Sequence, residues 1–312
     1  MAVNAQAIKE LRERTSAGMS DCKSALEEAS GDMEKAVLVI LKKGLAKSAK
    51  KAGAVAAEGE VRASVSKDKR AATLVEVNIQ TDFSARNDVF KQFVGDVLGV
   101  AENAKLGSEL GKAPLAGSTV NDMALALTGK IGEKIAVRRW DRVSVPEGKH
   151  GLAFAYVHMG GKIGVVLTVE TEGSAAAAHA EVEKLAENTA LQIASMSPLV
   201  LERSEVTKEM TDKQRGIYEG QMREDPKPKP EAAWPKIIEG KLNKWYSEIA
   251  LLDQESVCVP GQTIEKLREA ASKAAGAPVT IGKFVRYQLG EGIDRGAPKD
   301  DFAAEVAKMA GG

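Results

Sequence analysis

The chain has 312 residues, of which 44% are hydrophobic, so it can bury substantial cores and should divide into two to four folding units. Its 44 basic and 44 acidic side chains cancel, which excludes a general attraction to nucleic acid or to an acidic membrane and leaves only local patches. The N-terminus already carries Lys9 and Glu10, and no apolar run approaches the roughly 18 residues of a membrane span. We therefore expect a cytoplasmic protein without a signal peptide or a membrane span.

Cysteine and histidine show no metal-binding or disulfide pattern. Cys22 and Cys258 lie far apart in the sequence, and the histidines at positions 150, 158 and 179 lack the spacing of metal ligands. We expect two reduced cysteines, no metal site and no cofactor.

Residues 4–44 have the pattern of three short helices. Apolar side chains recur at helical spacing in each: Ile8 and Leu11, then Cys22, Ala25, Leu26 and Ala29, then Met33, Ala36, Val37, Ile40 and Leu41. Ser20 and Asp32 are the expected N-caps of the second and third helices, because their side-chain oxygens can accept hydrogen bonds from first-turn amides. The pattern predicts a small three-helix domain.

A basic stretch follows, at residues 42–51. It carries Lys42, Lys43, Lys47, Lys50 and Lys51. Nucleic-acid sites usually add arginine or aromatic rings to such a stretch, and neither occurs here, so we interpret it as a solvated helical linker.

An internal repeat begins near residue 60, where the apolar period changes to two. Residues 61–79 align without gaps on residues 153–171, at an offset of 92 positions. Each copy predicts a β-hairpin followed by a helix, with turns at 67–69 and 159–161. Two related α+β halves follow from this, each a small antiparallel sheet backed by helices.

The segment Thr81–Asn87 follows the buried strand expected at Thr73–Ile79. It places Asp82 and Phe83 side by side where the chain leaves the strand. Phe83 is then either a core side chain folded under the next helix or a probe for another molecule. These residues alone leave both interpretations open.

Residues 204–247 are charged and helical in pattern, interrupted at Asp225–Pro230, which contains three prolines. This predicts two antiparallel helices joined at a tip. The expected apolar residues are Val206, Met210, Ile217 and Tyr218 on one arm, and Trp234, Ile237, Ile238, Leu242 and Trp245 on the other. Beyond the hairpin we expect a helix at Thr263–Ala275, a strand at Val279–Leu289 that returns to the sheet, and a terminal helix at Asp301–Met309.

Catalytic motifs are missing from the sequence. No Gly-Lys pair is followed by the hydroxyl residue that a P-loop needs, and no Gly-x-Ser-x-Gly motif occurs. The glycine-rich stretch 160–164 joins two strands, so it predicts a hairpin turn and not a phosphate cradle. We expect no catalytic residues and no enzyme.

Several motifs together resemble the bacterial elongation factor Ts family, over essentially the whole chain. They are Ile8–Lys23, Glu76–Asn87, the set Tyr156, His158, Gly161, Ile163 and Gly164, and Asp301–Ala307. Two departures stand out. Ser84 occupies a position where the family usually has a small apolar residue, and the segment Leu251–Pro260 with Cys258 is less typical.

The resemblance implies a fold and a domain order. The fold would be α+β, with a ubiquitin-associated-like three-helix domain and basic linker at 1–53, core subdomains at 54–145 and 146–298, and a terminal helical module at 299–312. A coiled-coil hairpin would be inserted at about 204–247, with self-association as one possible role.

The resemblance also implies a partner and contact residues. The chain would be a guanine-nucleotide exchange factor for the GTPase elongation factor Tu, with Asp82 and Phe83 disturbing the partner's magnesium and phosphate site and Thr81, Arg86 and Asn87 flanking them. Further contacts are implied for Leu11, Arg12, Thr15, Gly18, Met19, His158, Gly161, Phe302 and Val306. Two alternatives from other classes are a nucleic-acid-binding or helical adaptor protein that uses residues 42–51, and an unrecognised hydrolase.

Overall fold

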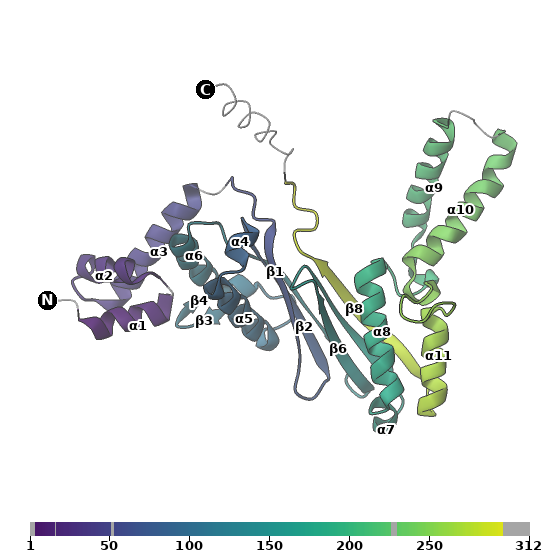
Figure 1. Ribbon diagram of the computed structural model, residues 1–312, viewed down its shortest axis with the longest axis horizontal. Helices are drawn as coiled ribbons and strands as arrows, with labels where there is room; N and C mark the ends of the chain where they lie inside the picture. The colour runs from purple at the N-terminus through teal and green to yellow at the C-terminus, as the bar shows by residue number, and fades with distance from the viewer. Residues whose placement is uncertain (1–3, 16, 51–52, 226–229, 296–312) are drawn as a thin grey trace, which may run out of the picture.

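The expected α+β class is confirmed. The computed structural model describes residues 4–15, 17–50, 53–225 and 230–295. Two three-stranded antiparallel sheets pack face to face in the centre, and helices cover the outer face of each (Figure 1). Three N-terminal helices lie at one end of the long axis and a helical hairpin projects at the other.

The N-terminal helices are α1 (Ala5–Thr15), α2 (Met19–Glu28) and α3 (Met33–Lys50). Asp32 is confirmed as a cap, since its Oδ1 accepts a hydrogen bond from Lys35 N at 3.1 Å. The Ser20 prediction was wrong, because α2 starts two residues earlier than a cap at Ser20 implies, with Gly18 at its N-cap and no side-chain cap.

The basic stretch 42–51 continues α3 as far as Lys50. Lys43 pairs with the preceding helix at the surface, since its Nζ lies 3.5 Å from Glu28 Oε2. Helix α3 also packs against α6 (Val120–Ile131), which sequence reasoning did not identify. The stretch is therefore part of a packed helix as well as a link to the core.

The first half of the core contains β1 (Glu58–Val65), β2 (Ala71–Ile79) and β5 (Ala136–Ser144), paired in the order β1-β2-β5. The helices α4 (Asp82–Ala85) and α5 (Asp88–Asn103) follow β2. A small hairpin of β3 (Pro114–Leu115) and β4 (Ser118–Thr119) precedes α6. Neither this hairpin nor β5 was predicted from the sequence.

The second half repeats this arrangement. It contains β6 (His150–His158), β7 (Ile163–Thr171) and β8 (Val279–Gln288), paired in the order β6-β7-β8. Its helices are α7 (Ser174–Ala177), α8 (Ala180–Met196) and α11 (Ile264–Ala275). The bounds of β7 and α7 lie 92 positions beyond those of β2 and α4, so both copies fold alike well past the aligned segment. The return of β8 to the sheet is confirmed by its pairing with β7.

The two sheets meet through a compact apolar layer and one buried charge. The layer is formed by Val61, Ala72, Leu74, Val143, Ala153, Val166, Tyr287 and Leu289. Glu76 is fully buried beside it and accepts hydrogen bonds from Arg138 Nη1 at 2.9 Å, Arg139 Nε at 2.5 Å and Gly290 N at 2.8 Å. Burial by itself would raise the pKa of Glu76, but these donors outweigh it and hold the pKa below its usual range. The carboxylate thus ties the first sheet to the turn after β8.

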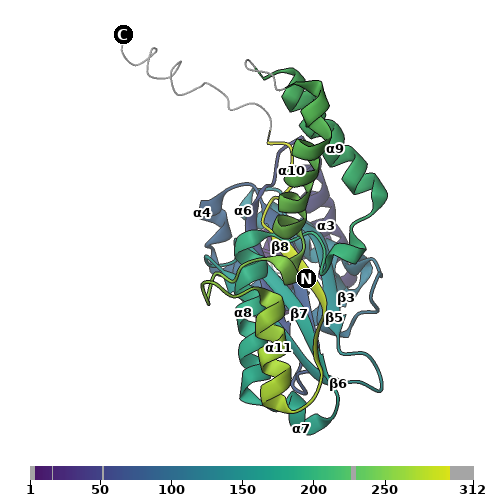
Figure 2. The ribbon, with the colours of Figure 1, turned by 90° about the vertical axis from the view of Figure 1, so that its right-hand side faces the viewer.

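The helical hairpin consists of α9 (Lys208–Arg223) and α10 (Trp234–Ile249), and it points away from both sheets (Figure 2). Its buried core is Met222, Ile238 and Leu242. Ile217 was wrongly predicted to lie on the apolar face, since 45% of it is exposed. Met222 of α9, which was not predicted, belongs to this core. Short 3-10 turns occur at Leu110–Lys112, Arg203–Glu205, Glu231–Ala233 and Leu251–Asp253.

Candidate functional site

The Thr81–Asn87 segment forms a one-turn helix, α4, directly after β2. Thr81 caps it, since Thr81 Oγ accepts a hydrogen bond from Ser84 N at 3.2 Å, and Asn87 caps α5 by accepting from Val89 N at 2.9 Å. Arg86 Nη2 lies 3.0 Å from Asp82 Oδ2 across the exposed face. Phe83 points outward with 85% of its surface exposed, more than any other large apolar side chain among the described residues. The interpretation of Phe83 as a core residue is therefore wrong.

A residue that sequence reasoning missed holds α4 in place. Glu133 lies in the loop after α6, and its Oε2 accepts from Thr81 N at 3.0 Å. Its Oε1 accepts from Thr81 Oγ at 2.8 Å and from Ser84 Oγ at 2.7 Å. Ser84, which departs from the family pattern, is the sequence feature linked to this contact, because its hydroxyl donates to Glu133.

The internal repeat shows what the fold requires at this position. Residue 175 is the equivalent of Phe83, and it is an alanine in the one-turn helix α7. The same strand, turn and helix thus form without an aromatic ring. Phe83 contributes nothing that the repeated architecture needs, and an exposed apolar side chain of this size commonly marks an interaction site.

A cavity of about 250 Å³ beside α4 is lined by residues from both halves of the core. It is lined by Gly59, Glu60, Asp82, Ala85, Arg86, Lys91, Met159, Gly160 and Lys162. Asp82 and Arg86 from the first half thereby face the turn that follows β6 in the second half. Met159 in that turn is 70% exposed and adopts a positive φ of 50°, which is uncommon for a residue with a long side chain. Sequence reasoning did not single it out.

The predicted residues of the second half lie in the same turn but differ in exposure. His158 is exposed, and its Nδ1 is 2.7 Å from Tyr156 Oη. Gly161 is buried, and a Cβ there would come within 2.5 Å of Glu60 Cγ. Its carbonyl accepts from Val61 N at 2.8 Å, so it joins the two halves. Next to it, the hydrogen bond from Lys162 holds the pKa of Glu58 below its usual range.

The N-terminal predicted residues do not line this cavity. Leu11 and Thr15 lie inside the three-helix core, where Thr15 Oγ donates to Leu11 O at 2.6 Å. Arg12 and Met19 are exposed, and Gly18 begins α2. Direct contact with another molecule is thus open to Arg12 and Met19. The predictions for Phe302, Val306 and the terminal helix fall outside the described residues.

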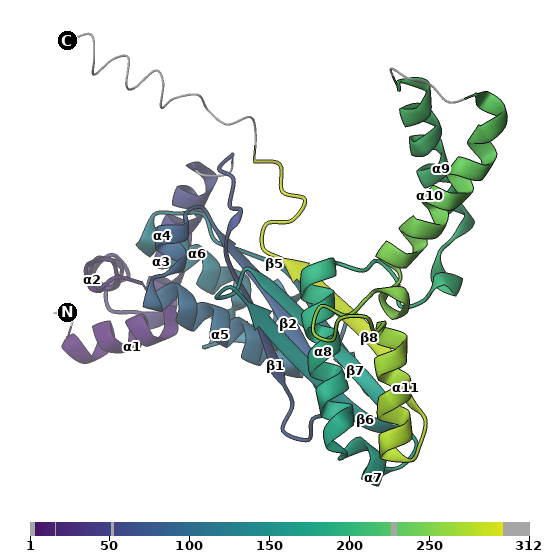
Figure 3. The same cartoon turned by 45° about the vertical axis from the view of Figure 1, so that its right-hand side comes forward.

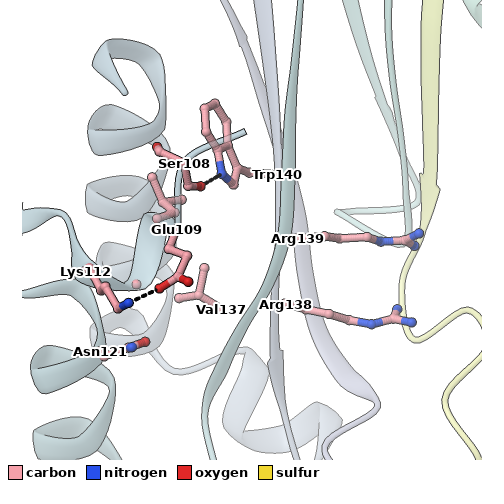
Figure 4. Close-up of a pocket in the computed structure, with 10 residues that line it drawn as sticks. Ser108, Glu109, Lys112, Asn121, Val137, Arg138, Arg139 and Trp140 are labelled. Carbon is pink, nitrogen blue, oxygen red and sulfur yellow. Dashed lines mark hydrogen bonds and ion pairs between the residues drawn. The ribbon is translucent and has the colours of Figure 1, made fainter. Parts of the chain in front are cut away.

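A second cavity, of about 330 Å³, lies between β5 and the segment Ser108–Lys112, with Asn121 of α6 at its edge (Figure 4). Trp140 Nε1 donates to Ser108 O at 3.2 Å, and Lys112 pairs with Glu109. The side chains of Arg138 and Arg139 point away from it, toward the sheet junction at Glu76. This cavity therefore contains no converging charged groups of the kind that surround α4.

Among residues whose positions the structure describes, no group of three or more His, Cys, Asp or Glu side chains is arranged to hold a metal ion. Within the same ranges, no helix is both long and apolar enough to cross a membrane.

Burial raises the pKa of both cysteine thiols, Cys22 and Cys258.

Comparison with known proteins points to one family. Residues 80–291 match the model of the family described as elongation factor TS. An elongation factor Ts of Clostridium perfringens is 44% identical over 312 residues, covering 99% of each chain. Those of a Nitratiruptor species and of Clostridium tetani are 43% and 40% identical, covering 98% of this chain and 99% of theirs.

Proposed function

The chain belongs to the elongation factor Ts family, and from this premise we propose that it is a guanine-nucleotide exchange factor. It binds elongation factor Tu carrying GDP and promotes GDP release during translation elongation, in the cytoplasm. The observation that carries the proposal is Phe83, an exposed ring held on a fixed one-turn helix beside Asp82.

Exchange needs no catalytic group. A protein that binds the GTPase more tightly when nucleotide and magnesium are absent must, by thermodynamic reciprocity, loosen both by the same factor. Phe83 would wedge between elements of elongation factor Tu beside its magnesium site, and Asp82 would compete for the groups that hold the ion. Arg86, Thr81 and Asn87 would flank this contact.

The remaining contacts follow the same family resemblance. The exposed residues Arg12 and Met19, with the C-terminal module that carries Phe302 and Val306, would grip the nucleotide-binding domain of elongation factor Tu. His158 would meet its other domains. The cavity lined by α4 and by the turn at Met159 supports contact with two neighbouring parts of the partner, because α4 and this turn lie side by side.

The proposal is tested by the release of fluorescent GDP from elongation factor Tu with the full chain present. We expect a large acceleration by the unaltered protein. Phe83→Ala removes an interface ring of about 2 to 4 kcal/mol, which corresponds to a roughly thirty-fold to thousand-fold slower exchange. Asp82→Ala should cost less, because the carboxylate is exposed and already shares a solvated ion pair.

The control is Leu106→Ala, which removes another exposed apolar side chain of the first half and should leave exchange unchanged. Thermal melts of all variants should coincide with the parent. Equal rates of GDP release with Phe83→Ala and with the parent would contradict the assignment of Phe83. If the parent does not accelerate GDP release, the proposed function is wrong.

A further inference from the structure

The hydrogen bonds that Glu133 accepts from α4 belong to the copy of the repeat that carries Phe83. One carboxylate accepts three hydrogen bonds from the first turn of α4, two from Thr81 and one from Ser84. The next residue adds a fourth tie, because Lys134 N donates to Gln80 Oε1 at 2.8 Å. The loop after α6 thus fixes the whole exit of β2.

A helix as short as α4 needs such ties. One turn forms at most a few backbone hydrogen bonds and is unstable by itself. Phe83 cannot anchor the turn, because its ring is exposed and packs against nothing that would orient it. The direction in which the ring points is therefore set by the groups that fix the backbone of Thr81 and Ser84.

The second copy is held differently. Gly173 occupies the N-cap of α7 and provides no side-chain cap, and Ala176, the equivalent of Ser84, is buried with 5% exposure. The buried Ala176 and a hydrogen bond from Thr171 Oγ to Gly173 O thus hold this turn, which consists of Ser174 and three alanines. In the turn that carries the exposed ring, Ala85 also packs against the core, and hydrogen bonds from Thr81 and Ser84 to a distant carboxylate are added.

We propose that Glu133 is a positioning residue for exchange, which presents Phe83 to the partner without touching it. This inference rests on the proposed exchange function. Charged acceptors form the stronger class of hydrogen bond, so the carboxylate can hold the turn even where water reaches it.

The test is a double-mutant cycle read out as the efficiency of GDP release from elongation factor Tu. Glu133→Ala should slow exchange by about tenfold, less than the roughly hundred-fold that a misplacement of about 1 Å can cost. In a Phe83→Ala background the same change should have no further effect, because the ring that Glu133 positions is gone. The matched control, Glu102→Ala on the exposed face of α5, should match the parent.

Two milder variants guard against misfolding of Glu133→Ala. Ser84→Ala removes one of the three hydrogen bonds. Glu133→Gln keeps one acceptor oxygen but replaces the other with an NH2 group, which cannot accept, so it cannot receive all three bonds. Both should fall between the parent and Glu133→Ala. Hydrogen exchange of the amides of Ser84–Arg86 should speed up in the same order, with the rest of the core unchanged.

The outcomes separate the inference from the function. If the parent accelerates release and Phe83→Ala does not, while Glu133→Ala equals the parent, the positioning role is wrong and the exchange function stands. Full additivity of the two substitutions would also overturn it, since Glu133 would then act on another contact. A parent without exchange activity would remove the function on which the inference rests.

Discussion

Glu76 is the one buried carboxylate among the residues that the structure describes. It is fully buried, and Arg138, Arg139 and Gly290 N all donate to it. Glu76→Ala leaves these donors without their acceptor, and we expect the free energy of unfolding to fall by about 3 kcal/mol. Denaturant unfolding measures this. Glu109→Ala, which breaks an exposed pair with Lys112, is the control and should cost less than about 0.5 kcal/mol.

The same carboxylate predicts a dependence of stability on pH. The pKa of Glu76 is lower in the folded protein than in the unfolded chain, so its stabilisation is fully present above the ordinary glutamate pKa of about 4.3. It is lost as the pH falls through the folded pKa. The free-energy difference between the parent and Glu76→Gln, which cannot titrate, should therefore shrink below about pH 4. A difference that stays constant through that range would contradict the assignment.

At the scale of elements, the contact of α3 with α6 depends on one glycine. A Cβ at Gly44 would come within 2.6 Å of Leu125 O, a backbone atom that cannot turn away. Alanine favours helices over glycine by about 1 kcal/mol, but here we expect Gly44→Ala to destabilise by about 1 to 3 kcal/mol because the helices must separate. Gly99→Ala in α5 is the matched control, with nothing within 4 Å, and its melting temperature should stay equal or rise.

The helical hairpin joins the second half through closely spaced ends. Leu199 N donates to Ile249 O at 2.9 Å, and Leu251 N donates to Val200 O at 3.0 Å. A short glycine linker can therefore replace residues 204–247. We expect this deletion to leave exchange largely intact and to change self-association, measured by GDP release and by sedimentation.

The hairpin projects from the side of α8 and α11 (Figure 3), far from the cavity beside α4. Replacing Leu242 by alanine, which weakens the hairpin core but keeps its length, serves as the comparison. Loss of exchange in a deletion that still melts like the parent would show that the hairpin acts on the partner directly.

Elements with a strong local signal could be predicted, and elements defined by tertiary packing could not. The repeat revealed both hairpins and their helices, because alternating apolar residues, and in the second copy the turn glycines, are local features. β5 carries Arg138, Arg139, Trp140 and Asp141 in succession, and its residues are mostly half-buried, so no alternation was visible. α6 is recognisable chiefly by its capping box at Thr119 and Asp122.

For the site, the sequence located the exposed ring but not its support. Asp82 and Phe83 are adjacent in the chain, whereas Glu133 meets Ser84 only through the fold of α6 and the loop behind it. The approach of Met159 to Asp82 likewise depends on how the two sheets pack. Such contacts carry no periodic signal, since they join residues far apart in the chain.

At the scale of the whole molecule, the features proposed to touch the partner are spread along its long axis. The three N-terminal helices lie at one end and reach the core through α3, and α4 lies on the core itself (Figure 1). Under the proposed function, an interface divided in this way would separate two contributions to exchange: the distant domain would add contact area and affinity, and Phe83 would act on the nucleotide site.

Removing residues 1–53 tests that separation. The truncated protein keeps α4, Glu133 and the cavity beside them, so the maximal rate of GDP release at saturation should change little. The concentration needed for half-maximal exchange should rise by about tenfold or more, because contact area is lost. The truncation also uncovers Ala126 on α6, so melts must accompany the kinetics. The double variant Arg12→Ala, Met19→Ala in the full chain keeps Ala126 covered by the N-terminal helices. It should also raise the concentration needed for half-maximal exchange. Normal binding by both proteins would place the N-terminal domain outside the interface.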